Sequence, residues 1–149
     1  MLTFRNTLLF LFFTGLLSPI ALADNYTVTV FQCVNKSQKK VNISLVNGEY
    51  VYQFGKLNQG PDITLTKKPE QLEGRYLTPK GDNGAAEIYE MDFKNGNYTY
   101  TISSFYFDSK HEAQVDVYQK DKLITTINCL PNTVVDNLRE HIFDLPNSN

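Results

Sequence analysis

Residues 41–54 read Val-Asn-Ile-Ser-Leu-Val-Asn-Gly-Glu-Tyr-Val-Tyr-Gln-Phe. Apolar and polar side chains alternate on both sides of the Asn47-Gly48 pair, and this period of two residues is that of a β-strand with one buried face. Asn and Gly both tolerate positive φ, so the pair is typical of a two-residue hairpin turn. The stretch therefore predicts two antiparallel strands joined at Asn47-Gly48.

Runs of the same kind continue on either side of this hairpin. They lie at residues 26–34, 63–66, 89–95, 98–102, 115–117 and 123–129. The pattern Asn-Gly-x-Tyr-x-Tyr-x-apolar begins at Asn47 and again at Asn95. Either a duplicated four-stranded unit or two independent hairpins with the same turn and strand preferences would explain the repeat. Residues 67–86 are rich in Gly, Pro and charge and predict a long surface loop, broken by a short extended piece at residues 75–77.

The predicted fold class is all-β, a small antiparallel barrel or curled sandwich of about eight strands. Closure is favoured because it removes exposed strand edges. The alternating tyrosines are expected to be core or barrel lining. A short C-terminal helix is predicted after residues 131–133, because apolar residues then follow at helical spacing and Thr133-x-x-Asp136 suits a capping box. Residues beyond Asp144 are expected to fray.

The first 23 residues have the order of a secretory signal peptide. One basic residue, Arg5, precedes an apolar run, and Ala21-Leu22-Ala23 forms a small-residue cleavage site. The prediction is a periplasmic or secreted protein with residues 1–23 removed and residues 24–149 forming a single β domain, with no membrane span after cleavage. An oxidising compartment favours a disulfide between Cys33 and Cys129, which would tie the first strand to the last.

Composition limits the classes of function. The 149 residues are 42% hydrophobic and 20% charged with a net charge of −2. This balance excludes a disordered chain and gives no basic surface for nucleic acid. We find no catalytic motif and no metal-ligand spacing around His111 and His141, so we expect a protein that is not an enzyme and needs no metal or cofactor. Glu90 and Asp92 share a strand face that is expected to be solvated.

Two loops have the composition of contact surfaces. Residues 103–112 mix aromatic residues with both signs of charge, which is common at protein interfaces. Their predicted contact residues are Phe105, Tyr106, Phe107, Lys110 and His111. In the alternative reading Phe105 and Phe107 continue a strand into the core and residues 108–112 form a solvated turn. Residues 55–62 form the other polar loop.

Short fragments carry a family resemblance. Gly74-Arg75-Tyr76 and Lys80-Gly81, with the signal peptide and a cysteine in the first and last strands, resemble the periplasmic inhibitors of C-type lysozyme. Members of that family are small antiparallel barrels whose Ser-Gly-x-x-Tyr and Lys-Gly elements enter the lysozyme cleft. The resemblance implies that Tyr76 and Lys80 lie in an inhibitory loop. The chain is also similar to immunity proteins that neutralise wall-degrading toxins in the periplasm.

These observations predict a periplasmic protein-binding module with a protein partner, either an inhibitor or an immunity protein directed at a cell-wall hydrolase such as lysozyme. One alternative is a small-molecule or lipid carrier that uses a tyrosine-lined barrel. Another is a secreted structural or adhesin-type subunit, for which oligomerisation would be the sign.

Overall fold

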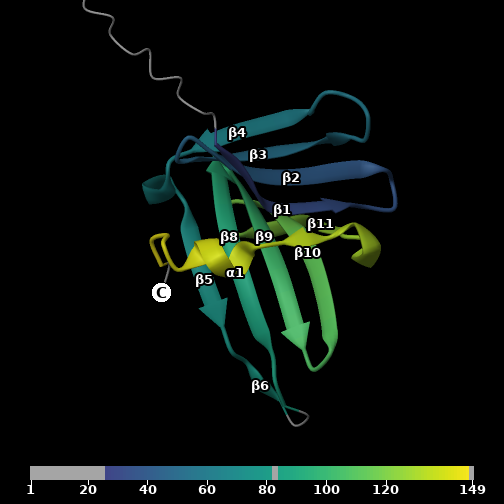
Figure 1. Cartoon of the computed structure of the whole chain (residues 1–149), viewed down its shortest axis with the longest axis vertical. Coiled ribbons are helices and arrows are strands. Elements are labelled where there is room, and N and C mark those ends of the chain that lie inside the picture. Colours follow the sequence, from purple (N-terminus) through teal and green to yellow (C-terminus); the bar gives the residue numbers. More distant parts are fainter. Residues whose placement is uncertain (1–25, 82–83, 148–149) are drawn as a thin grey trace, which may run out of the picture.

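A computed structural model describes residues 26–81 and 84–147. The predicted signal peptide, residues 1–23, and its cleavage site lie outside the described residues. Two antiparallel sheets pack against each other, and Figure 1 shows that their strands cross steeply. In each sheet we call the face turned toward the other sheet the inner face.

The first sheet has the strand order β12-β1-β2-β3-β4 and the second has the order β11-β10-β9-β8-β5. Strands of the first sheet are β1 (Thr27–Val34), β2 (Lys39–Val46), β3 (Glu49–Lys56), β4 (Ile63–Lys67) and β12 (Val135–Asp136). Strands of the second sheet are β5 (Glu73–Leu77), β8 (Glu87–Asn95), β9 (Tyr98–Phe107), β10 (Lys110–Gln119) and β11 (Lys122–Asn128). β6 (Lys80–Gly81) and β7 (Gly84–Ala85) form a two-stranded arm beyond the ends of β5 and β8 (Figure 1). The helices are two 3-10 turns, Pro69–Gln71 and Pro131–Thr133, and α1 (Leu138–Ile142).

Both Asn-Gly pairs form hairpins, as predicted, but with different turns. Asn47 and Gly48 both have positive φ, at 50° and 84°, and link Val46 to Glu49. In the second hairpin Asn95 is the last paired residue of β8, and the two-residue turn is Gly96-Asn97, with φ of 59° at Gly96. Each pair joins the second and third strands of a four-stranded meander, β1-β2-β3-β4 and β5-β8-β9-β10.

The sheets form a sandwich, so the barrel alternative is wrong, and the described residues hold twelve strands where about eight were predicted. Aromatic side chains fill the space between the sheets. Tyr52 is fully buried, and its ring lies 5.5 Å from that of Phe93 and 5.2 Å from that of Tyr100. A bulge between Thr29 and Phe31 turns both Val30 and Phe31 inward, which is why strict alternation fails in β1.

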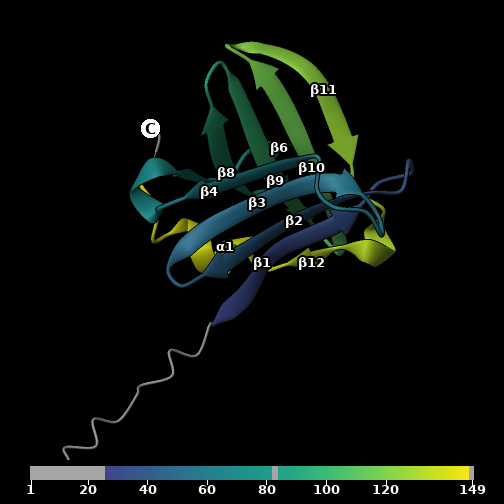
Figure 2. The same cartoon turned by 90° about the horizontal axis from the view of Figure 1, so that it is seen from above.

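The predicted disulfide joins Cys33 of β1 to Cys129, directly after β11, and so links the two sheets. The chain then returns to the first sheet as β12 and continues into α1, which packs on β8 and β5 (Figure 2). We call residues 130–147 the C-terminal strap. The first sheet and the strap cover much of the inner face of the second sheet, whose lower end in Figure 1 extends past them.

Three local predictions are corrected. The extended piece inside residues 67–86 is a paired edge strand, β5, rather than an interruption of a loop. Residues Val135 and Asp136 are a strand, and the hydroxyl of Thr133 bonds the carbonyls of Val34 and Leu130, so Thr133 and Asp136 do not form a capping box. The chain beyond Asp144 is held down to residue 147, because Gly74 N–H donates to the carbonyl of Pro146 at 2.9 Å.

Candidate functional site: an aromatic row at one end of the second sheet

Five rings lie in a row on the inner face of the second sheet, at the end that carries the β6–β7 arm. The contacts run from His111 to Tyr106, then to Tyr89, Tyr76 and Phe143. His111 and Tyr106 are stacked at 4.3 Å, and Tyr89 and Tyr76 are stacked at 5.0 Å. Strand register explains the order, since Tyr106 is paired with His111 across β9 and β10, and Tyr89 with Tyr76 across β8 and β5. We call this set the aromatic row.

The middle of the row is buried, and the end formed by Tyr76 and Phe143 is open to solvent. Tyr89 is 2% exposed, whereas Tyr76 is 39% exposed and Phe143 is 63% exposed. The guanidinium of Arg139 lies over the Tyr89 ring, 5.8 Å from its centroid, within the range of cation–π attraction. Glu87 accepts hydrogen bonds from the hydroxyls of Tyr76 and Tyr89 at 3.2 and 2.9 Å. Burial, with the bond to Glu87, raises the pKa of Tyr89 to about 12.

A buried carboxylate fixes the end of the row formed by His111 and Tyr106. The side chain of Asp136, on β12, is 5% exposed. Its Oδ2 accepts hydrogen bonds from the hydroxyls of Ser104 and Tyr106, both at 2.6 Å. Its Oδ1 accepts the N–H of Leu138 at 3.0 Å and so satisfies a free donor at the start of α1. Burial and the bond to Asp136 raise the pKa of Tyr106. Asp136 therefore connects the C-terminal strap to the second sheet.

Ser104, His111 and Asp136 are the residue types of a serine hydrolase triad, but their connectivity is different. In a triad the serine bonds the histidine and the histidine bonds the carboxylate. Here Ser104 Oγ donates directly to Asp136, and Nε2 of His111 lies 2.9 Å from the same oxygen with its N–H poorly directed for a hydrogen bond. Ser104 is also fully buried. The cluster is suited to holding the strap and not to attacking a substrate.

A small cleft adjoins the row where the strap crosses β8 and β9. Its volume is about 200 Å³. It is lined by Glu87, Tyr89, Tyr106, Asp136, Asn137, Arg139 and Glu140. A partner side chain entering here would meet aromatic edges and charges of both signs.

The structure brings together three of the seven predicted contact residues. Tyr76, Tyr106 and His111 are members of the aromatic row. Lys80 is exposed on the β6–β7 arm beyond the same end of the sheet. The other three predicted residues, Phe105, Phe107 and Lys110, belong to the opposite, outer face.

Phe105, Phe107 and Lys110 point to the outer face because β9 turns Ser104 and Tyr106 inward. The prediction of a loop at residues 103–112 is wrong: β9 continues through Phe107, as in the alternative reading, and β10 begins at Lys110. The other part of that reading is also wrong, because Phe105 is half-buried, Phe107 is 39% exposed, and neither enters the core. Sequence reasoning missed Tyr89, Arg139 and Phe143 as members or neighbours of the site. Arg139 and Phe143 come from the strap, which no local pattern places on this sheet.

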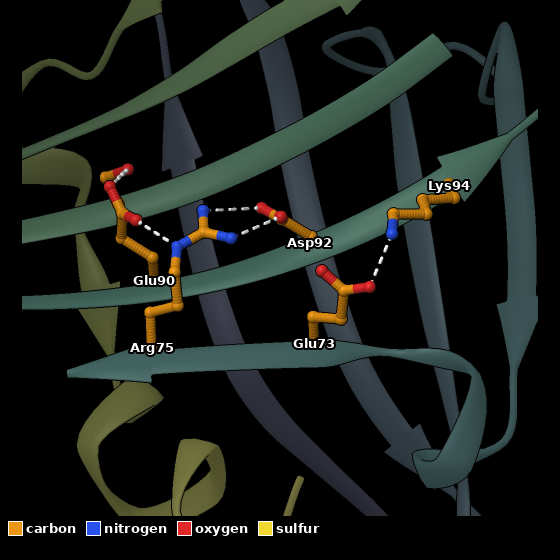
Figure 3. Close-up of polar contacts among 6 residues, drawn as sticks. Glu73, Arg75, Glu90, Asp92 and Lys94 are labelled. Carbon is orange, nitrogen blue, oxygen red and sulfur yellow. Dashed lines mark hydrogen bonds and ion pairs between the residues drawn. The ribbon is translucent and has the colours of Figure 1, made fainter. Parts of the chain in front are cut away.

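The outer face of β5, β8 and β9 carries a second polar cluster, drawn in Figure 3. Arg75 donates to Glu90 at 2.7 Å and to both oxygens of Asp92, at 2.6 and 3.1 Å. Burial opposes the charge of Arg75, but the hydrogen bonds to Asp92 and Glu90 outweigh it and raise the pKa of the guanidinium. Glu73 and Lys94 form a further ion pair on the same face.

The expectation that Glu90 and Asp92 form a solvated face is wrong, because Asp92 is only 5% exposed. Arg75 uses its planar fork to join an edge strand to its neighbour. This arrangement explains why β5 is paired although its sequence is polar. The cluster is structural.

Among residues 26–81 and 84–147 no group of acidic, histidine or cysteine side chains could hold a metal ion. In the same part of the chain no helix is long and apolar enough to cross a membrane. No protein-family model, curated protein or solved structure matches the chain.

Proposed function

We propose that the protein is an exported binding module that holds a partner protein against the open end of the aromatic row. The observation that carries the proposal is the exposed pair Tyr76 and Phe143, whose rings lie 5.8 Å apart and both contact Tyr89, the ring under Arg139. Tyr and Arg are the residues that most often dominate binding energy at protein interfaces. They sit on a disulfide-linked sandwich, so little ordering is needed on binding.

The partner we propose is a cell-wall hydrolase of the lysozyme type. Two features support this choice. The resemblance to periplasmic lysozyme inhibitors rests on Tyr76 and Lys80, and Lys80 is exposed on an arm beside the aromatic row. Such hydrolases work with a pair of carboxylates in a cleft, and a projecting lysine complements a cleft of that charge.

The test is binding of immobilised residues 24–149, in the oxidised form, to a panel of cell-wall hydrolases, measured by biolayer interferometry. Tyr76→Ala is expected to weaken binding by roughly thirty-fold, the effect of losing about 2 kcal/mol. Phe107→Ala is the matched control, because Phe107 is also 39% exposed and lies at the same end of the sheet on the opposite face. Its affinity should match that of the unmodified protein.

Lys80→Ala separates inhibition from simple binding. It is expected to restore turnover of the captured hydrolase more than it weakens capture, because Lys80 is assigned to the cleft. Failure of every hydrolase to bind at low salt would refute the choice of partner. Equal losses in Tyr76→Ala and Phe107→Ala would refute the aromatic row as the binding surface.

A further inference from the structure

Basic side chains gather at one corner of the first sheet, away from the aromatic row. Lys39 is paired with Lys56 across β2 and β3, and Lys40 is paired with Gly55. Asp62 is the nearby carboxylate, and it lies 3.9 Å from Lys39 in a surface ion pair. Side chains alternate along a strand, so the register assigns Lys39 and Lys56 to one face of the sheet and Lys40 to the other. In a chain whose net charge is −2, this corner has three lysines against one aspartate. We call it the lysine corner.

The polar loop at residues 55–62 folds back over this corner and makes it concave. Asp62 N–H donates to the carbonyl of Phe54 at 2.8 Å, and Leu57 N–H donates to that of Gln38, in the β1–β2 turn, at 2.8 Å. A Cβ at Gly55 would lie 2.8 Å from backbone atoms of Pro61 and Asp62, so only glycine lets the loop approach this closely. Figure 1 shows both turns at the same end of the first sheet.

The result is a cleft of about 290 Å³ under the loop. Its polar lining comes from Lys40, Asn42, Gln53, Lys56, Asn58 and Gln59. Asn42 and Gln53 are directly paired across β2 and β3 and form its floor. No carboxylate is among the lining residues, and neither Lys40 nor Lys56 has an ion-pair partner in the described part of the chain.

We propose that this cleft binds a short acidic glycan, with the lysines facing its carboxylate groups and the amides facing its hydroxyls. Lysine ammonium groups bind carboxylate and phosphate as point charges. Asn and Gln supply both donors and acceptors, which is what hydroxyl groups need. Single-stranded nucleic acid would require exposed rings for base stacking, whereas the large exposed apolar side chain at this cleft is Leu57.

The experiment is a titration of residues 24–149 with galacturonate tetrasaccharide, followed by amide chemical shifts in NMR and by calorimetry. Shifts are expected in β2, β3 and residues 55–62, with affinity that falls as salt is added. A neutral glucose tetrasaccharide and inorganic phosphate are the comparison probes. We expect weaker binding of both, because the first lacks charge and the second lacks the hydroxyl-bearing chain.

The variant Lys40→Gln with Lys56→Gln is expected to lower affinity for the tetrasaccharide by at least about ten-fold. Lys110→Gln with Lys122→Gln removes the same charge from exposed positions of the second sheet and should leave affinity within about two-fold. Gln53→Ala tests the amide floor without changing charge and should also weaken binding.

Three results would overturn the proposal. They are the absence of any shift at about 10 mM tetrasaccharide, equal losses in the two double-lysine variants, and equal affinity for phosphate and tetrasaccharide, which would mean that charge alone is recognised. None of these outcomes depends on whether the aromatic row binds a hydrolase.

Discussion

Replacing Asp136 with alanine tests whether one carboxylate holds the C-terminal strap to the second sheet. Asp136→Ala removes the acceptor for Ser104, which is fully buried, and for Tyr106. It also removes the acceptor for the N–H of Leu138 at the start of α1. The deleted side chain is 5% exposed, so water cannot replace it without opening the interface.

The magnitude follows from these contacts. A hydrogen bond to a charged group contributes about 1.5–3 kcal/mol, and a buried donor left without a partner costs about 1–3 kcal/mol. Burying the carboxylate itself costs free energy, which offsets part of what these hydrogen bonds contribute to stability. The individual contributions therefore do not simply add. We expect Asp136→Ala to lower the free energy of unfolding by roughly 3–5 kcal/mol, which is among the larger effects of a single substitution.

The assay is urea unfolding of the oxidised protein, followed by circular dichroism, with Asp144→Ala as the control. Asp144 is an exposed aspartate of the same strap, and its loss should change stability by less than about 0.5 kcal/mol. Adding Ser104→Ala and Tyr106→Phe to Asp136→Ala should recover part of the loss, because the stranded hydroxyls are then gone. Equal stability of the Asp136 and Asp144 variants would refute the reasoning, and so would a triple variant less stable than Asp136→Ala.

Four further changes are expected to have distinct effects. Serine at both Cys33 and Cys129 should lower the free energy of unfolding by roughly 4–5 kcal/mol, since the bridge spans 96 residues, and urea unfolding with and without reductant measures it. Gly74→Ala should cost about 1–3 kcal/mol and shift the strap's amide signals, because a Cβ there would lie 2.5 Å from a carbonyl oxygen of α1. Tyr52→Phe should leave stability unchanged or raise it by up to about 1 kcal/mol, since the Tyr52 hydroxyl is buried with no hydrogen-bond partner among the described residues. Burial and the hydrogen bond to Glu87 raise the pKa of Tyr89 from 10.0 to about 12. As pH rises above 10, the unfolded chain loses the hydroxyl proton of Tyr89 before the folded chain does, so the free energy of unfolding should fall. Tyr89→Phe should make that fall less steep between pH 10 and 12, and urea unfolding across this range would show the difference.

The hairpins and the disulfide could be predicted because their signals are local or unique. Asn47-Gly48 forms the first turn itself, Gly96 supplies the positive φ of the second turn, and two cysteines allow one pairing. Strand β5 could not be recognised as a full sheet member in the same way. Position 74 faces inward, where α1 leaves room only for a hydrogen, and Arg75 is needed because it bonds Glu90 and Asp92 on β8. Both reasons come from residues far along the chain.

The direction of Tyr106 follows from the alternation of side chains along its strand. Tyr98, Tyr100 and Ile102 alternate in one strand, and the same parity places Ser104 and Tyr106 on that face, with Phe105 and Phe107 on the other. Hydrophobicity predicts the opposite orientation, with Phe105 and Phe107 inside, because phenylalanine is buried more often than serine. The interior at this end of the second sheet is polar, because the buried carboxylate of Asp136 accepts hydrogen bonds from Ser104 and Tyr106.

Asp136 also links the fold to the proposed binding surface. Its partner Tyr106 is a member of the aromatic row, and the helix whose first turn it caps is followed directly by Phe143. An apolar residue at position 136 could pack there, but it would not fix the rotation of the strap, whereas a carboxylate with directed partners does. The polar cluster thus sets where Arg139 and Phe143 stand relative to Tyr76. A partner that binds this surface depends on Asp136 without contacting it. Asp136→Asn should therefore weaken partner binding by more than the lower stability of the variant would cause.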